Sequence, residues 1–326
     1  MICLNIDLKS ICKHEVSTIP PWTRHDPLYN YELAADKKAS TNPDVFKSKY
    51  NEIKDRHQRF NYLYTDGSKD AGRVAAAVVS ENGVLSCRLP DQASIFTAEL
   101  TAIDLALDMI EDEGYWRYII FTDSLSAMQA LDNNNVSFNP LITNILNRLS
   151  VISENCNIVF CWLPSHIGII GNEKADRAAK AALSGSIVSK KIPFSDFKPC
   201  INSFIHDVWQ RSWSSPDNAN NKLFEIKPIL SESVIFNMSR REEVVLSRLR
   251  IGHSYLTHSF LLKKEVRPQC THCDEPLTIR HIILSCQHFA SIRRRFYNVN
   301  NLSDLFSSCT YQLLEFLKEI NLFYKI

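Results

Sequence analysis

The pattern of apolar and polar positions changes at Phe60, and from there it predicts strands and helices in turn. Residues 60–66, 73–80 and 83–89 are typical of strands, and Glu81-Asn82-Gly83 is a hairpin signal. A predicted helix at 94–112 follows, then apolar strands at 118–123 and 157–163, with short helices from Leu125 and Asn139 between them and a last helix near Asn172. Fully apolar strands separated by helices indicate a parallel sheet covered on both faces, so we expect an α/β fold.

The flanks of this pattern differ from it in composition. Residues 1–58 are rich in turn-forming and charged residues, with one predicted helix at 45–57, and we interpret them as a connector. After a Ser-, Lys- and Pro-rich stretch that begins at Ser184, we expect a linker and helical segment at 185–235 and a mostly helical basic tail at 236–326. The α/β domain itself is predicted at 59–184.

Composition narrows the class of protein. An apolar fraction of 45% with 22% charged residues is typical of globular protein and excludes disorder and fibres. Charged residues interrupt the N-terminal apolar run, so we expect neither a signal peptide nor a membrane partner. The prediction is an intracellular protein, nuclear or cytoplasmic. Most of the ten cysteines stand in apolar runs and are expected to be buried free thiols.

Charge is distributed unevenly although the net charge is only +1. Residues 60–183 hold 8 basic and 15 acidic residues, whereas residues 240–295 hold 11 basic and 5 acidic ones. A basic region beside an acidic one indicates that part of the chain binds a polyanion. The alternative for any one basic cluster is a solvated helix face.

Four acids occupy positions where burial would be costly. Asp66 and Asp123 each end an apolar strand, Glu99 lies on the helix face that must pack on the sheet, and Asp176 lies in the Ala-rich last helix. Taken singly, each could be a cap or half of an ion pair. Together they form a set of hard oxygen ligands that selects Mg²⁺ or Mn²⁺, and two such ions suit phosphodiester hydrolysis.

Five separated segments carry a resemblance to a known family. They are Tyr64-Thr65-Asp66-Gly67-Ser68, Thr97-Ala98-Glu99-Leu100, Phe121-Thr122-Asp123-Ser124, Pro164-Ser165-His166-Ile167-Gly168 and Gly171-Asn172-Glu173-Lys174-Ala175-Asp176. In order and spacing they resemble the motif set of type 1 ribonuclease H. The residues of these motifs are most similar to those of the ribonuclease H domain that follows reverse transcriptase in non-LTR retrotransposons of the jockey and I-like groups.

The resemblance implies a fold and a set of roles. The fold would be a five-stranded mixed sheet of order 3-2-1-4-5 with helices on both faces. Asp66 would bridge two metal ions, Glu99 and Asp123 would complete the site that positions the cleaved strand, and Asp176 would hold the ion that activates water. His166 would assist proton transfer or product release; the alternative for it is a solvated loop histidine.

The substrate implied by the resemblance is RNA paired to DNA. Hybrid would be recognised through ribose 2′-hydroxyls, with substrate contacts expected at Gly67, Ser68, Ser124 and Asn172. Reverse transcriptase or RNA of the retroelement would be further partners. Several cellular relatives carry a basic substrate-binding segment between the middle helices, but residues 132–140 of this chain contain no Lys or Arg. Substrate must therefore be bound by other residues, or be bound weakly.

A second metal site is predicted near the C-terminus. Cys270 and Cys273 form a tight pair, and His281 and Cys286 follow at a spacing that suits a structural Zn²⁺. The resemblance supports zinc, since similar tails carry a Cys-Cys-His-Cys element. The alternative is a coincidence of free thiols, and His272 and His288 are competing ligands.

Two functions follow from these observations. The first is a metal-dependent endoribonuclease that cuts the RNA strand of RNA:DNA hybrids, derived from a retroelement. The alternative is a catalytically inactive, retroelement-derived module that binds nucleic acid. The presence of all four carboxylates favours the first, because a decaying site is expected to lose one of them.

Overall fold

The computed structural model describes residues 6, 8–13, 27–133, 138–188, 190–218, 221–231 and 237–326. The chain divides into two compact units, Met1–Asn202 and Ser203–Ile326. Each unit is described by itself below. No helix of the described ranges is long and apolar enough to span a bilayer.

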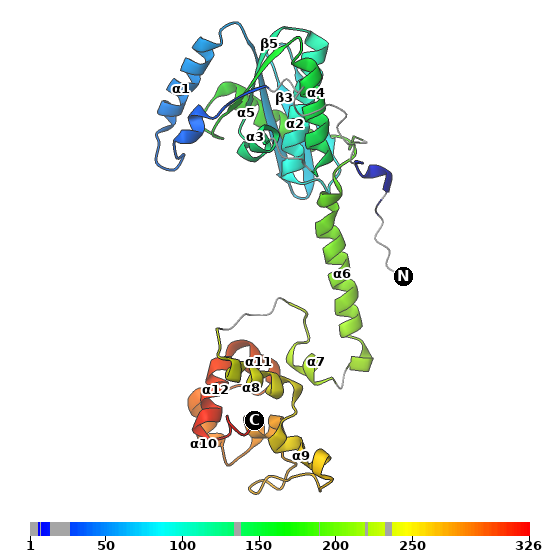
Figure 1. Ribbon diagram of the computed structural model, residues 1–326, viewed down its shortest axis with the longest axis vertical. Helices are drawn as coiled ribbons and strands as arrows, with labels where there is room; N and C mark the ends of the chain where they lie inside the picture. The colour runs from blue at the N-terminus through cyan, green and yellow to red at the C-terminus, as the bar shows by residue number, and fades with distance from the viewer. Residues whose placement is uncertain are drawn as a thin grey trace. The chain divides into compact units, whose positions relative to one another are not determined.

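One six-stranded sheet forms the centre of the first unit (Figure 1). Its strands are β1 (Leu28–Asn30), β2 (Asn61–Asp70), β3 (Arg73–Val79), β4 (Val84–Leu89), β5 (Arg117–Thr122) and β6 (Asn157–Trp162). They lie in the order β1-β6-β5-β2-β3-β4, with β2, β3 and β4 antiparallel and β2, β5, β6 and β1 parallel. The predicted mixed sheet of order 3-2-1-4-5 is confirmed, and β1 adds a sixth strand at its parallel edge.

Helices cover both faces of this sheet, as predicted. They are α1 (Pro43–Arg56), α2 (Ile95–Glu113), α3 (Leu125–Asp132), α4 (Pro140–Ile152) and α5 (Ile170–Ala182). The helices α2, α3 and α4 bury apolar side chains against one face, and α1 and α5 bury theirs against the other. Helix α2 begins at the cap Ser94, whose hydroxyl accepts from the Thr97 N–H, and ends at Gly114, which has a positive φ of 69°.

The segment before β2, expected to be a connector, is partly folded onto the sheet. A 3-10 turn η3 (Glu32–Ala35) and α1 bury Leu33, Phe46 and Ile53 completely. Complete burial of such side chains stabilises the fold by roughly 1.5–3 kcal/mol each. Residues 28–56 are therefore part of the first unit's core, which the turn-forming composition of this segment did not indicate.

The segment after α5, expected to be a linker, also packs onto the sheet unit. Ile192 is fully buried, and the 3-10 turn η4 (Phe194–Phe197) buries Phe197 against the α2 face. The Asp196 carboxylate accepts from the Ser94 N–H at 3.0 Å and from the Thr97 hydroxyl at 2.6 Å, at the first turn of α2. The ordered first unit therefore extends well beyond the predicted boundary at residue 184.

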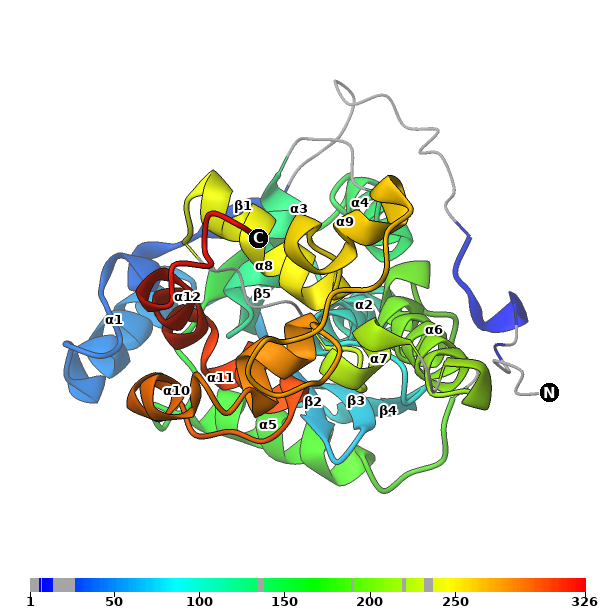
Figure 2. The ribbon, with the colours of Figure 1, turned by 90° about the horizontal axis from the view of Figure 1, so that it is seen from below.

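The second unit is helical, as predicted for the tail. After the boundary helix α6 (Lys198–Trp213), its elements are η5 (Pro216–Asn218), α7 (Lys222–Ile226), α8 (Arg240–Ile251), α9 (Tyr255–Lys263), the π-turn η6 (His281–Ser285), α10 (Ala290–Phe296), α11 (Leu302–Ser308) and α12 (Thr310–Glu319). Helices α8, α11 and α12 belong to this unit (Figure 2). They bury one apolar cluster, to which Phe323 near the C-terminus also contributes.

Candidate functional site

Two adjacent parallel strands, β2 and β5, bring the first two acids together. The parallel pairing of β2 and β5 ends at Thr65 opposite Thr122, so Asp66 and Asp123 follow side by side. Asp123 ends its strand as predicted. Strand β2, however, continues to Asp70, because its hairpin with β3 pairs Asp66 opposite Ala77.

Glu99 reaches the same place from α2, and Gly67 makes this approach close. A Cβ atom on Gly67 would lie 2.8 Å from the Glu99 backbone nitrogen, so the close contact of strand and helix requires glycine at this position. The backbone N–H of Gly67 lowers the pKa of Glu99, against the larger effect of burial. The Glu99 Oε2 atom is buried and has no hydrogen-bond partner among the described residues.

The three acids form one group with unusual electrostatics. Oxygen atoms of Asp66, Glu99 and Asp123 all lie within 4.8 Å of one another. Burial, together with the charge of neighbouring carboxylates, raises the pKa of Asp66 to about 8 and that of Glu99 to about 9. Burial also raises the pKa of Asp123, whereas the Asn172 side chain and His166 lower it. Such a group favours either bound protons or a bound cation.

The fourth predicted acid lies in an adjoining group. Ligand atoms of Asp176, His166 and Glu173 lie within 4.8 Å of one another, and the charge of Asp176 raises the pKa of both Asp66 and Asp123. The structure thus brings Asp176 beside the other three acids but groups it with two further residues. Glu173 was not predicted from the sequence as a member of this group; its place one turn before Asp176 was the signal that could have found it.

The loop before α5 presents His166 in a constrained conformation. His166 has a positive φ of 53° and Gly168 one of 81°, and α5 begins two residues later. Gly171 packs against the Tyr64 ring, where a Cβ would lie 2.3 Å from the ring. Because this contact leaves no room for a side chain, it fixes the start of α5, and with it Asp176, on strand β2.

The expected substrate residues have internal roles as well. The Ser124 hydroxyl caps α3 by accepting from the Ala127 N–H at 3.4 Å, and Gly67 packs against the backbone of Glu99. Ser68 and Asn172 are largely buried, and Asn172 Oδ1 has no partner in the described chain. Contact of these four residues with nucleic acid stays a prediction.

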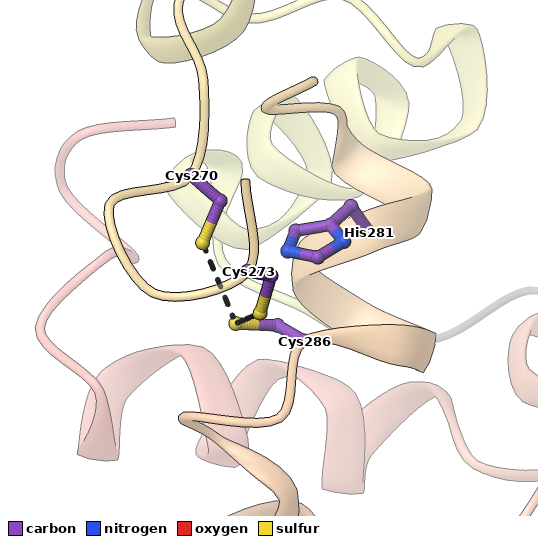
Figure 3. A group of neighbouring side chains, drawn as sticks. All are labelled: Cys270, Cys273, His281 and Cys286. Atoms are coloured by element: carbon purple, nitrogen blue, oxygen red, sulfur yellow. Dashed lines mark hydrogen bonds between the residues drawn. The ribbon is translucent and has the colours of Figure 1, made fainter. Parts of the chain in front are cut away.

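The predicted zinc ligands also come together. One ligand atom from each of Cys270, Cys273, His281 and Cys286 lies within 4.8 Å of the others (Figure 3). The π-turn η6 closes with the Cys286 N–H donating to the His281 carbonyl at 2.7 Å, which explains how this spacing brings both side chains to one point. The competing residues His272 and His288 stack on each other instead, with ring centroids 3.8 Å apart.

Details around this group suit a metal. His281 is buried, its Nδ1 lies 2.8 Å from the Glu275 carboxylate, and its Nε2 has no partner in the described chain. A carboxylate contact of this kind commonly orients a metal-binding histidine. The backbone N–H of His272 lowers the pKa of the Cys270 thiol to about 7, which favours the thiolate, whereas burial raises the pKa of Cys286.

Several arginines of the basic tail have partners within their own unit. Arg248 donates to the Ile326 carbonyl, Arg241 to that of Phe323 at 3.2 Å, and Arg293 to that of Cys286 at 3.0 Å. These contacts stabilise the helical unit and were not visible from the sequence. Fewer of its charges are thus available for a polyanion than the sequence count suggested.

The sheet order and the acids at its strand ends are those of an α/β domain of the ribonuclease H type. Residues 58–184 match the family model for RNase H. The Pol polyproteins of equine infectious anemia virus isolates 1369 and CL22 are each 33% identical to this chain over 124 residues, which cover 36% of it and 10% of the viral protein. The chain thus spans about a tenth of the length of these relatives.

Proposed function

We propose that the ribonuclease H domain hydrolyses the RNA strand of RNA:DNA hybrids with two Mg²⁺ or Mn²⁺ ions held by Asp66, Glu99, Asp123 and Asp176. The observation that carries this proposal is the group of three acids whose oxygens lie within 4.8 Å of one another. Holding them as anions without a cation costs several kcal/mol. Ligands that are all oxygen favour hard divalent ions over zinc or copper.

The residues present fit such ions. Glu99 Oε2 is buried without a partner among the described residues, and oxygens of Asp66 and Asp123, which follow the last residues paired between β2 and β5, lie within 4.8 Å of a Glu99 oxygen. When bound, two divalent ions would activate a water molecule and stabilise the leaving oxygen of the RNA strand.

The chain's own groups would orient the acids and move protons. The Asn172 side chain lowers the pKa of Asp123 and would hold its carboxylate in place, while Lys180 pairs with Asp176 at 2.8 Å. An imidazole nitrogen of His166, within 4.8 Å of oxygens of Glu173 and Asp176, would accept or deliver a proton as the cleaved strand leaves. Ser68, Gly67, Ser124 and Asn172 remain the candidates for contact with the hybrid.

The proposal also covers the origin of the domain, which we assign to a retroelement. The viral relatives are named Pol polyprotein, and the motif residues resemble those of non-LTR retrotransposons of the jockey and I-like groups. We propose that the domain derives from such an element and that reverse transcriptase or RNA of the element would be its partners. The Cys-Cys-His-Cys group would then hold a structural Zn²⁺ in the tail, supported by the His281 Nε2 atom, which has no partner in the described chain.

A cleavage assay tests the proposed function. The full chain is incubated with labelled RNA:DNA hybrid, single-stranded RNA or duplex DNA, with Mg²⁺ or with a chelator. We expect cleavage of the RNA strand of the hybrid only, dependent on Mg²⁺, with 3′-hydroxyl and 5′-phosphate ends. Tight binding of hybrid with no cleavage under any divalent ion would instead favour the inactive binding module.

A further inference from the structure

A groove of about 410 Å³ lies between α1 and the start of α5, outside the carboxylate site. Both helices pack on the same face of the sheet. Basic and aromatic side chains of three elements line the groove: Lys47, Tyr50, Lys54, Tyr62, Tyr64 and Lys174. Among the described residues, Glu81 is the one carboxylate of its lining. The groove is thus a positively charged feature of a domain whose sequence carries an excess of acids.

The lysines of α1 are held in place by packing. Phe46 and Ile53 on the same helix are fully buried, and the Tyr50 hydroxyl lies 2.5 Å from that of Tyr64 on β2. Lys47 and Lys54 are separated by two helical turns, so they lie on one side of α1. Packing therefore fixes the helix from which both lysine side chains extend.

These charges are weakly neutralised by the protein. The Lys54 ammonium lies 4.5 Å from the centre of the Tyr62 ring, which holds the cation without removing its charge. Lys47 pairs with Asp44 at 3.4 Å, but the Asp44 side chain is 81% exposed, so solvent screens this pair. Lys174 is exposed and makes no ion pair within the described ranges.

The groove adjoins the carboxylate site. Gly168 and Gly171 line it, and the same loop carries His166 and leads into the helix of Asp176. On β2, Tyr64 and Asp66 point to the same face at a separation of roughly 7 Å, the rise of two strand residues. The side chain of Lys38 also reaches this loop, donating to the Ser165 hydroxyl at 3.0 Å.

We infer that this groove binds the phosphate backbone of the nucleic acid strand that lies in the carboxylate site. The inference rests on the proposed hybrid substrate, and it assigns the grip on that substrate to α1 and Lys174. A polyanion that approaches four carboxylates needs nearby positive charge. Segment 43–56 supplies this charge although it precedes the residues that match the family model.

Binding measurements with matched variants test the inference. In the Asp123→Asn background, which prevents cleavage, Lys47, Lys54 and Lys174 are changed together to Gln, and hybrid affinity is measured between about 50 and 200 mM salt. The control changes three exposed basic residues outside the groove, Arg73, Lys191 and Lys198, to Gln, with the same change in net charge. A third variant changes the groove lysines to Arg.

We expect the groove variant to lose about tenfold or more in affinity. Its slope of log affinity against log salt should fall by roughly 2, since each phosphate that the protein neutralises contributes roughly 0.7 to 0.9 to that slope. The Arg variant should keep both affinity and slope, and the control should lose little. Equal losses of affinity in groove and control variants, or an unchanged slope in the groove variant, would overturn the inference. Failure of the proposed function would be seen separately, as absence of hybrid cleavage by the unaltered chain.

Discussion

The two candidate metal sites differ in how the chain builds them. The carboxylate site draws its four acids from the interior of β2 (Asp66), the end of β5 (Asp123) and two helices (Glu99 and Asp176), which are far apart in the sequence. The Cys-Cys-His-Cys group draws its four residues from 270–286 alone. Apolar cores on both faces of the sheet hold the first site, whereas a bridge between Gln269 and Pro276 and the π-turn η6 support the second.

This difference indicates which of the two sites needs a bound ion to keep its folded conformation. The carboxylates are held together by packing, so they repel one another in the absence of metal and the protein bears that cost. Residues 264–276, which carry Cys270 and Cys273, are mostly exposed, so a bound ion would supply much of the stability of this stretch. The second half of the group is packed, since Ile279, Ile282 and Ile283 are buried in the helical cluster. Removing metal should therefore loosen the second site, while the first keeps its shape.

The largest expected effect is on catalysis. Asp123→Asn keeps the shape of the side chain and removes its charge, so hybrid cleavage should fall on the order of a thousandfold while folding is preserved. His166→Ala should slow turnover by about a hundredfold at most, because a residual proton path through water remains. Initial rates with labelled hybrid measure both.

The control for these rates is Asp112→Asn, an exposed acid at the end of α2. Its rate should match that of the unaltered chain. Equal and modest losses of rate in Asp123→Asn and His166→Ala would contradict the assigned roles.

Zinc removal is expected to act on the other site alone. The purified full chain should contain about one Zn²⁺, and chelation should increase hydrogen exchange in residues 264–289 while Mg²⁺-dependent cleavage continues. Cys273→Ser should have the same effect as chelation. Cys309→Ser, outside the group, should keep the metal. If the chain holds no metal after purification in zinc-containing buffer, the prediction of a zinc site is wrong and these cysteines are free thiols.

The boundary of the first unit gives a third expectation. A chain that ends at residue 185 lacks Ile192, Phe197 and the Asp196 carboxylate that binds the start of α2, whereas one that ends at residue 213 retains them. The shorter chain should be less stable by at least about 3 kcal/mol, the value of burying two such side chains. Urea unfolding of the two truncations measures this, and equal midpoints would show that residues 186–213 add nothing.

How much of the fold and of the carboxylate site could be predicted depended on how far apart in the sequence the interacting residues lie. The alternation of strands and helices and the positions of the four acids followed from periodicity and motif spacing, because local pattern decides which face of an element a residue occupies. The strand order was implied by the resemblance to type 1 ribonuclease H. Asp196 gave no signal, since its partners Ser94 and Thr97 lie about a hundred residues away. The helix predicted at 45–57 is present as α1 (Pro43–Arg56), but its packing on β2 gave no signal because it depends on the tertiary fold.

A smaller effect is expected from the tail. Removing residues 214–326 should leave the carboxylates intact and lower hybrid affinity, with a salt slope reduced by roughly 0.7 to 0.9 for each phosphate that the tail neutralises. Because Arg241, Arg248 and Arg293 bind carbonyls of their own unit, we expect few such phosphates, bound by residues such as Lys263, Lys264 and Arg267. Unchanged affinity and slope would mean that the tail's basic surface has no part in holding the hybrid.

The smallest effect tests the strain of the metal-free carboxylate site. Glu99→Gln removes a buried charge without changing the side-chain volume, and its amide can donate to the carboxylates of Asp66 or Asp123 nearby. The metal-free variant should therefore be more stable than the unaltered chain by about 1–3 kcal/mol near neutral pH. Because burial raises the folded-state pKa of Glu99 to about 9, the penalty is absent below its unfolded-state pKa and grows as the pH rises towards 9. Urea unfolding with a chelator at pH 5 and pH 8 should show a gain at pH 8 that shrinks at pH 5, and a variant that is less stable at both would show that the metal-free protein accommodates this charge at no cost.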